Sequence, residues 1–447
     1  MSVMAPAGAR EKMTAEDRRV LTGTMIGTTI EWYDFFIYAQ AAGLVFAQLY
    51  FAPLGQGSVL AQMVSWASLG ISFLFRPLGA VIAGHFGDQF GRKKVLVATL
   101  ILMGAATTLI GILPTHAQIG ITAPLLLVLL RIIQGISAGG EWGGAALMAV
   151  EHAPVGKRGI FGSYPQIGVP AGMILATLVV FIMTSVTTPE QFLTWGWRIP
   201  FLFSVVMIIV GYFIRRAVSE SPVFQEMAAK KRETASPLRE LIKRNPKAIV
   251  LAALVFIGSN AAGYLLIAFL SSYAIRVHKM DRPGILLAST LAGMSWLVFT
   301  MVGGHLSDRW GRIKTVKVGY ILMFVWMVPL FLLIDAANVW LYLLALVGLT
   351  IGNGLTYGPL SALFAEMFPA EIRYSGISIA YAIGAILGGA FAPLAAEWLL
   401  GATQSSLSIA AYIMILCIAS YIGAAFIREP KGIDLVAGAS SALSDRR

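Results

Sequence analysis

The stretch at 84–92, Gly-His-Phe-Gly-Asp-Gln-Phe-Gly-Arg, returns at 304–312 as Gly-His-Leu-Ser-Asp-Arg-Trp-Gly-Arg. Each copy directly follows a long apolar run. A second pattern, Glu-x-x-Pro-x-x-x-Arg, follows another apolar run at 151–158 and is repeated at 366–373. Two matching loops at nearly the same separation indicate an internal repeat. They predict two homologous helical bundles that face each other, with a site at their interface.

The composition excludes a soluble enzyme and a disordered chain. Of the 447 residues, 57% are hydrophobic and only 12% are charged, whereas soluble domains carry about 25% charged residues. A membrane-spanning helix needs about 20 apolar residues, and lipid offers the backbone no hydrogen-bond partner outside the helix. We therefore predict an all-α membrane protein with twelve transmembrane helices in two pseudo-symmetric six-helix bundles. The predicted spans are 20–50, 59–83, 95–113, 121–150, 160–184, 197–214, 248–275, 284–306, 315–334, 339–364, 374–396 and 405–427.

The longest polar stretch lies between the sixth and seventh predicted spans and divides the chain into two halves. We predict a cytoplasmic N-terminal tail at 1–19 and an N-terminal six-helix bundle at 20–218. A cytoplasmic linker at 219–247 connects this bundle to a C-terminal six-helix bundle at 248–427, and a cytoplasmic tail follows at 428–447.

The distribution of charge predicts the orientation. The chain has 33 lysines and arginines against 22 aspartates and glutamates, a net charge of +11. In a soluble protein this excess would suggest a nucleic-acid partner. Here most basic residues lie in the loops on one side of the predicted membrane. An excess of lysine and arginine is typical of cytoplasmic loops. We expect a multi-pass protein of a bacterial-type inner (plasma) membrane, with both termini cytoplasmic, a lipid bilayer around it and no nucleic-acid partner.

The sequence indicates neither a metal site nor a bound cofactor. The only cysteine, Cys417, lies in the last apolar run, which excludes intramolecular disulfides and a cysteine-rich metal site. None of the five histidines lies in the middle of a span. We therefore expect neither a metal nor an organic cofactor.

Five charged residues lie well inside apolar runs of the first half: Glu31, Asp34, Arg76, Arg131 and Glu141. A charged side chain at a helix centre costs about 2.5–3.5 kcal/mol, so each requires a partner or a function. Binding of one proton would make the set of three acids and two bases neutral. This suits a site that takes up and releases a proton, although burial alone would favour the same balance.

Two of these acids, Glu31 and Asp34, are three residues apart and share one helix face. Their proximity and their burial both favour a protonated form of one of them. The sequence does not decide which one holds the proton, because coupled groups titrate as a pair. The alternative is a static ion pair that joins two helices.

A polar stripe runs along the fourth predicted span, where Arg131, Gln134 and Glu141 lie on nearly one helix face. We predict that Arg131 senses protonation of the acid in the first span. Arg76 or Arg131 could also hold a substrate carboxylate through two parallel hydrogen bonds. In the alternative interpretation, Arg76 only neutralises Glu31 or Glu141.

Further polar residues in the spans could complete a substrate cavity. Each of them could equally form an ordinary hydrogen bond between helices. They are Tyr33, Gln166, Asn260, Tyr264 and Tyr381.

The motifs resemble those of the major facilitator superfamily over nearly the whole chain. The pattern Gly-x-x-x-Asp-x-x-Gly-Arg-Lys at 84–93 is similar to its hallmark loop between spans two and three, and Arg-Ile-Ile-Gln-Gly at 131–135 to its proton-linked motif in span four. Finer motifs are similar to the metabolite:proton symporter branch, whose members carry shikimate, 2-oxoglutarate, citrate, or proline and betaine. They are Glu-Trp-Tyr-Asp-Phe at 31–35, Arg-Pro-Leu-Gly at 76–79, Gly-Gly-Glu-Trp at 139–142 and Trp-Gly-Trp-Arg-Ile-Pro-Phe at 195–201.

The resemblance implies roles for several residues. It favours Asp34 as the proton-coupling carboxylate, facing Arg131 across spans one and four. It also implies that two cytoplasmic charge clusters latch the halves together and that the functional unit is a monomer. The gating clusters are Asp88, Arg92 and Glu151 in the first half and Asp308, Arg312 and Glu366 in the second.

The sequence thus predicts a secondary active transporter that takes up a small organic acid, such as a shikimate-like or dicarboxylate metabolite, with a proton by alternating access. The alternative cargo is a zwitterionic osmolyte such as proline or betaine. A membrane-embedded enzyme is disfavoured, because the sequence has no catalytic histidine cluster, metal motif or activated nucleophile. The charges in spans one and four argue against a non-transporting receptor, and the one-sided polar residues argue against a channel.

Overall fold

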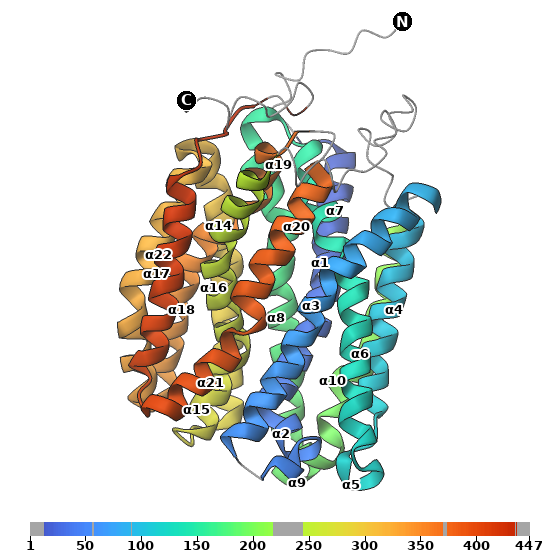
Figure 1. Cartoon of the computed structure of the whole chain (residues 1–447), viewed down its shortest axis with the longest axis vertical. Coiled ribbons are helices and arrows are strands. Elements are labelled where there is room, and N and C mark those ends of the chain that lie inside the picture. The colour runs from blue at the N-terminus through green and yellow to red at the C-terminus, as the bar shows by residue number, and fades with distance from the viewer. Residues whose placement is uncertain are drawn as a thin grey trace, which may run out of the picture.

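The computed structural model describes residues 13–55, 58–90, 92–217, 245–369, 373–433 and 435, without the side chains of 84–96, 155 and 215–217. Its elements are helices that run roughly along one axis (Figure 1). The predicted linker at 219–247 and the two predicted tails lie largely outside the described residues, so the predicted domain boundaries remain predictions.

The first half of the chain forms the helices α1 to α11. Some predicted spans consist of two or more consecutive short helices. Together the helices correspond to the first six predicted spans. They are α1 (Ala15–Ala41), η1 (Ala42–Phe46), α2 (Ala47–Leu49), η2 (Ala52–Leu54), α3 (Val59–Phe90), α4 (Arg92–Ile112), α5 (His116–Ile119), α6 (Thr122–Ala138), α7 (Glu141–Glu151), η3 (Val155–Lys157), α8 (Arg158–Val186), α9 (Pro189–Gln191), η4 (Phe192–Gly196), α10 (Arg198–Leu202) and α11 (Ser204–Ala217).

The second half repeats this pattern from α14 to α22 and corresponds to the last six predicted spans. Its helices are α14 (Pro246–Tyr264), η5 (Leu265–Phe269), α15 (Leu270–Arg276), α16 (Arg282–Trp310), α17 (Arg312–Asp335), α18 (Val339–Tyr357), α19 (Leu360–Met367), α20 (Arg373–Ala385), η6 (Ile386–Ala390), α21 (Ala392–Thr403) and α22 (Leu407–Ala425).

Ten helical segments of the described chain are long and apolar enough to cross a membrane, and Val97–Ile112 is a shorter apolar helix. The predicted first span is absent from this set because α1 carries charged residues at its start and buries Glu31 and Asp34. The predicted all-α membrane fold is confirmed. The first span is unusual because its charges oppose burial in lipid and must be satisfied inside the protein.

Three glycines bring α3 and α6 into backbone contact. A Cβ atom at Gly79 would overlap the backbone of Ile136, one at Gly135 the backbone of Ser72, and one at Gly139 the backbone around Arg76. Small residues of this kind let membrane helices approach closely. The crossing places the part of α3 that carries Arg76 directly against α6.

The two halves meet at several helix pairs. Helix α8 packs along α16 and against α19, and α7 packs against α19 and α20. Helix α3 packs against α20, η6 and α21, and α1 packs against η5. In Figure 1, α17, α18 and α22 lie at the left edge and α4 and α6 at the right, with α3, α8 and α20 between them. The interface that the internal repeat predicts is therefore present.

Candidate functional site

The guanidinium of Arg76 on α3 lies in a cage of aromatic rings beside a buried acid. Its Cζ atom is 4.4 Å from the ring centre of Phe35, 4.7 Å from that of Phe73 and 5.3 Å from that of Trp32. Its Nη2 is 4.0 Å from Glu31 Oε1, and both side chains are buried. At this distance the two groups form an ion pair but no hydrogen bond.

One edge of the Arg76 guanidinium forms no hydrogen bond, although its Nη2 is the atom nearest to Glu31. Nε and Nη2 are buried and have no hydrogen-bond partner among the described residues. These two nitrogens form the edge through which arginine binds a carboxylate by two parallel hydrogen bonds. The edge therefore has the geometry of an anion-binding fork.

Polar groups of the second half face this fork. The ring centre of Tyr264, at the end of α14, is 5.1 Å from that of Phe73 and 6.2 Å from that of Trp32. The hydroxyl of Tyr264, Oδ1 of Asn260 and Nε1 of Trp32 are buried and have no hydrogen-bond partner in the described part of the chain. We call Glu31, Trp32, Arg76, Asn260 and Tyr264 the Arg76 cluster. A buried polar group without a partner costs about 1–3 kcal/mol, so this cluster is suited to a polar ligand.

A glycine in η6 leaves room for two members of the cluster. A Cβ atom at Gly389 would overlap Asn260 Oδ1 and lie 2.6 Å from the Tyr264 ring. We expect Gly389→Ala to displace both groups and to raise the apparent KM for substrate about tenfold, equivalent to about 1.4 kcal/mol. Uptake kinetics would measure this.

The matched control is Gly144→Ala on α7, where a Cβ atom would make only an ordinary contact with Tyr374 at 3.8 Å. An unchanged KM in Gly389→Ala would place the substrate away from Asn260 and Tyr264.

Aromatic stacking connects the halves beside this cluster. Trp142 on α7 stacks on Tyr381 on α20, with ring centres 3.9 Å apart, and Tyr381 stacks on Phe256 at 4.5 Å. Nε1 of Trp142 donates to Gln166 Oε1 (2.9 Å), and Nε2 of Gln166 donates to the carbonyl of Tyr357 (3.1 Å). Gln166 and Tyr381 thus bridge the halves.

Asp34 lies in a second polar site between α1, α4 and α11. Its Oδ1 accepts a hydrogen bond from Ser204 Oγ (2.7 Å), and Thr107 lies nearby, where its hydroxyl donates to the carbonyl of Met103 (3.0 Å). Gln134 Nε2 donates to Thr107 Oγ1 (2.7 Å), and Arg131 Nη1 donates to Gln134 Oε1 (2.7 Å). Two neutral side chains, Thr107 and Gln134, therefore lie between Asp34 and Arg131.

Among the described contacts, no ion pair joins Asp34 to Arg131, and the predicted coupling of the two in proton transport remains a prediction. Arg131 Nη1 donates to Gln134, and its Nη2 turns toward α3. Arg131 Nη2 donates to Ser72 Oγ (2.6 Å) and to the carbonyl of Leu69 (3.0 Å). Its guanidinium also lies 3.9 Å from the ring centre of Tyr38.

Two other predicted residues belong to the first half. The hydroxyl of Tyr33 donates to the carbonyl of Pro200 (2.6 Å), and Glu141 begins α7 and is buried. The predicted roles of both residues remain predictions.

The sequence reasoning overlooked several residues that the structure brings into these sites. Thr107 and Ser204 were recognisable as isolated hydroxyls in apolar runs, whereas aromatic residues in spans are too common to single out. The overlooked residues are Trp32, Tyr38, Thr107, Trp142, Ser204 and Tyr357.

Repeated charges join the halves at the upper end of Figure 1, which we call the basic end. Arg158 pairs with Glu366 (3.4 Å), and Arg373 pairs with Glu151 (3.7 Å). Each glutamate of the repeat thus pairs with the arginine of the other half.

Arg312 strengthens this connection within the second half. It pairs with Glu366 (3.1 Å) and with Asp308 (2.6 Å). Asp308 in turn accepts hydrogen bonds from the backbone N–H groups of Gly159 and Ile160 (2.8 Å each) at the start of α8, where a negative charge is favoured. The side chains of the other two predicted gating residues, Asp88 and Arg92, lie outside the described residues.

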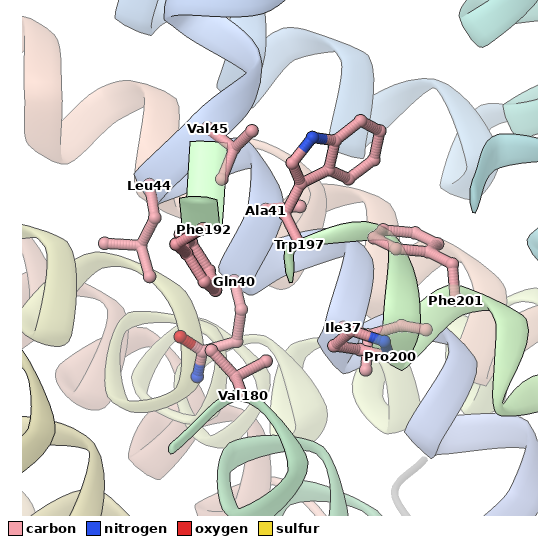
Figure 2. A pocket seen from close by; sticks show the side chains of 10 residues that line it. All are labelled: Ile37, Gln40, Ala41, Leu44, Val45, Val180, Phe192, Trp197, Pro200 and Phe201. Carbon is pink, nitrogen blue, oxygen red and sulfur yellow. The ribbon is translucent and has the colours of Figure 1, made fainter. Parts of the chain in front are cut away.

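The halves also touch at the opposite end, near η1. Gln40 Nε2 donates to the carbonyl of Ile267 in η5 (3.2 Å), and Ser272 Oγ donates to the carbonyl of Gly43 in η1 (3.0 Å). Gln40 also lines the apolar pocket shown in Figure 2, with residues of α1, η1, α8, η4 and α10. Contacts between the halves therefore lie on both sides of the Arg76 cluster.

Comparison with known proteins identifies relatives over most of the chain. Residues 24–393 match the model of the Major Facilitator Superfamily. The chain is 40% identical to the inner membrane metabolite transport protein YhjE of Escherichia coli (strain K12), over 85% of this chain and 87% of that protein. It is 36% identical to the shikimate transporter of the same strain (92% and 94% covered). It is 32% identical to the proline/betaine transporter of Salmonella typhimurium (96% and 86% covered).

The fold is similar to that of solved structures. The proton:xylose symporter XylE bound to 6-bromo-6-deoxy-D-glucose superposes with a TM-score of 0.77 at 18% identity, covering 94% of this chain and 98% of that chain. Identity at this level shows the fold alone. Together with the sequence relatives, it confirms the predicted fold and the resemblance inferred from the motifs.

Proposed function

We propose that this chain, which belongs to the major facilitator superfamily and is a membrane transporter rather than an enzyme, carries a small organic acid together with a proton into the cell. The observation that carries the proposal is the Nε–Nη2 edge of Arg76 between the two halves, which forms no hydrogen bond with the described residues. The relatives named as metabolite and shikimate transporters support the class of cargo.

The Arg76 cluster favours an acid that also carries hydroxyl groups. A substrate carboxylate would take both hydrogen bonds of the Arg76 edge. The Tyr264 hydroxyl and Trp32 Nε1 could donate to further oxygens, and Asn260 Oδ1 could accept from a hydroxyl. Because these groups come from both halves, a bound substrate would hold the halves together around itself.

Two carboxylates of the protein, Asp34 and Glu31, take part in proton coupling in this proposal. Asp34 holds the proton in the first half and communicates with Arg131 through Thr107 and Gln134. A substrate carboxylate on Arg76 would lie close to Glu31, so protonation of an acid in this half relieves repulsion between like charges. Binding of acid and binding of proton would therefore favour each other.

A zwitterionic osmolyte is the second candidate, because relatives include proline/betaine transporters. Its carboxylate would also suit Arg76. A quaternary ammonium, however, is recognised by open aromatic faces. The rings of Trp32, Phe35 and Phe73 already face the Arg76 guanidinium, which favours the hydroxylated acid.

Uptake into proteoliposomes tests the proposal. The screen uses labelled shikimate, 2-oxoglutarate, citrate, malate, proline and betaine, with and without an inward proton gradient. We expect one of the acids to accumulate only with the gradient. Accumulation of proline or betaine alone would select the osmolyte, and uptake that ignores the gradient would make the protein a uniporter.

We further propose that the basic end faces the cytoplasm of a bacterial inner membrane and that its charge cluster keeps this side closed. Replacing Glu366 by glutamine would leave Arg158 and Arg312 buried without their shared carboxylate. Removing one partner of a buried ion pair costs about 3–5 kcal/mol, so we expect Glu366→Gln to lower the thermal unfolding temperature of the purified protein clearly.

The control for this measurement is Glu190→Gln, because Glu190 is exposed on α9 at the opposite end. It is expected to unfold like the unmodified protein. Equal unfolding temperatures for Glu366→Gln and the control would mean that the cluster does not stabilise the closed end.

A further inference from the structure

The chain continues beyond α22 as a segment that lies across the basic end. We call residues 428–433 together with Leu435 the C-terminal strap. Both oxygens of Glu429 accept hydrogen bonds from the backbone at the start of α17, from Arg312 N (2.9 Å) and Ile313 N (3.0 Å). Lys431 Nζ donates to the carbonyl of Arg309 (3.2 Å). The strap is thus attached to the α16–α17 turn.

The turn that receives Glu429 is shaped for this contact. Gly311 has a φ angle of +101°, in the left-handed region that favours glycine, and a Cβ atom there would lie 2.5 Å from Glu429 Oε2. Pro430, next to Glu429, is buried, and so is Leu435 at the other end of the strap. Both charged and apolar groups therefore hold the strap in place.

The strap also binds both arginines of the internal repeat. Arg158 Nη1 donates to the carbonyl of Ile433 (2.6 Å), and Arg373 Nη2 donates to the carbonyl of Leu435 (2.7 Å). These are the arginines that pair across the interface with Glu366 and Glu151. One short segment outside the repeat thus accepts a hydrogen bond from one arginine of each half.

Both guanidiniums are nearly fully buried, with residue exposures of 4% for Arg158 and 3% for Arg373. A buried arginine needs its donors satisfied in order to remain in an ion pair. Without the strap, Arg158 and Arg373 would each lose a short hydrogen bond, and water would reach both ion pairs that connect the halves.

We propose that the C-terminal strap is a third component of the gate at the basic end, and that it must detach before this end opens. The inference rests on the proposed transport function only in assuming that the end opens during the cycle. It assigns the strap a role in the opening equilibrium and none in substrate binding.

Two truncations separate the strap from the rest of the tail. One ends at Ile427 and removes the strap, and the matched control ends at Leu435 and keeps it. The reporter is Ser361→Cys in a Cys417→Ser background. Ser361 is buried on α19, and its Cβ atom would be 3.0 Å from a Cβ atom at Gly162 in the other half, so a thiol there reacts only when the basic end opens.

We expect the thiol to react about tenfold faster with a maleimide in the chain ending at Ile427 than in the chain ending at Leu435, which should match the full chain. The full-length variant Glu429→Gln weakens the attachment to α17 and should react several-fold faster than the unmodified full chain. It tests the proposal without truncation, in case the truncated chain misfolds. Equal labelling rates in Glu429→Gln and the full chain, or in the two truncations when both are folded, would overturn the proposal.

This readout needs no substrate. If the labelling rate depended on the strap but the protein transported none of the tested compounds, the proposed role of the strap would stand and the proposed cargo would be rejected.

Discussion

Asp34→Asn is expected to remove proton-driven accumulation while leaving substrate movement down its gradient. Asparagine keeps an oxygen that can accept the hydrogen bond of Ser204, so the fold should be retained, but it cannot take up a proton. For symport of one proton, an inward gradient of 1 pH unit supplies about 1.4 kcal/mol and supports about tenfold accumulation. In Asp34→Asn the ratio of internal to external substrate concentration should fall to about 1.

Proteoliposomes with a fixed pH difference measure this ratio directly. The control is Ser204→Ala, which removes the hydrogen-bond donor and keeps the carboxylate, and which should still accumulate substrate. If Asp34→Asn concentrated substrate as well as the unmodified protein did, Asp34 would not be the proton site. Glu31→Gln would then be the next variant to examine.

Arg76→Lys is expected to lose most of its affinity for substrate. Lysine keeps the positive charge beside Glu31 but has no Nε–Nη2 edge, so it cannot hold a carboxylate by two parallel hydrogen bonds. Hydrogen bonds to charged groups contribute about 1.5–3 kcal/mol, which predicts an apparent KM at least about tenfold higher. Initial uptake rates over a range of substrate concentrations measure this change.

Arg198→Lys serves as the matched control. Arg198 also belongs to the first half, but it donates to the carbonyls of Gly111 and Leu113 near the opposite end, so its replacement should leave KM unchanged. Normal transport by Arg76→Lys would support the alternative that Arg76 only neutralises Glu31.

The architecture was predictable because it depends on length, hydropathy and repetition. The twelve predicted spans correspond to described helices, since a helix is the only stable conformation for a single apolar segment in lipid. The repeated Glu-x-x-Pro-x-x-x-Arg loops predicted two facing halves. They did not show that each glutamate pairs with the arginine of the opposite half, because an internal repeat gives the equivalence of two segments and not their contacts.

The candidate site was predictable only in part. The charges of Arg76, Glu31 and Asp34 were conspicuous because ionisable residues are costly in apolar runs. The partners of Asp34 were not, because Thr107 and Ser204 are hydroxyl residues that commonly bond to their own helix. The resemblance alone suggested that Asp34 faces Arg131, and it did not show that Gln134 bonds both Arg131 and Thr107.

The sequence by itself determined that the chain spans a membrane in two related halves and that its buried charges lie in the first half, because these properties follow from local composition and spacing. The tertiary structure decided which groups meet. The glycine crossing of α3 and α6 places Arg76 against α6, and the packing of α14 against η6 adds Asn260 and Tyr264 to the Arg76 cluster. The tertiary structure also placed the carbonyls of Ile433 and Leu435 on Arg158 and Arg373. Such contacts join residues far apart in the chain, and only the relative rotation and translation of packed helices fixes them.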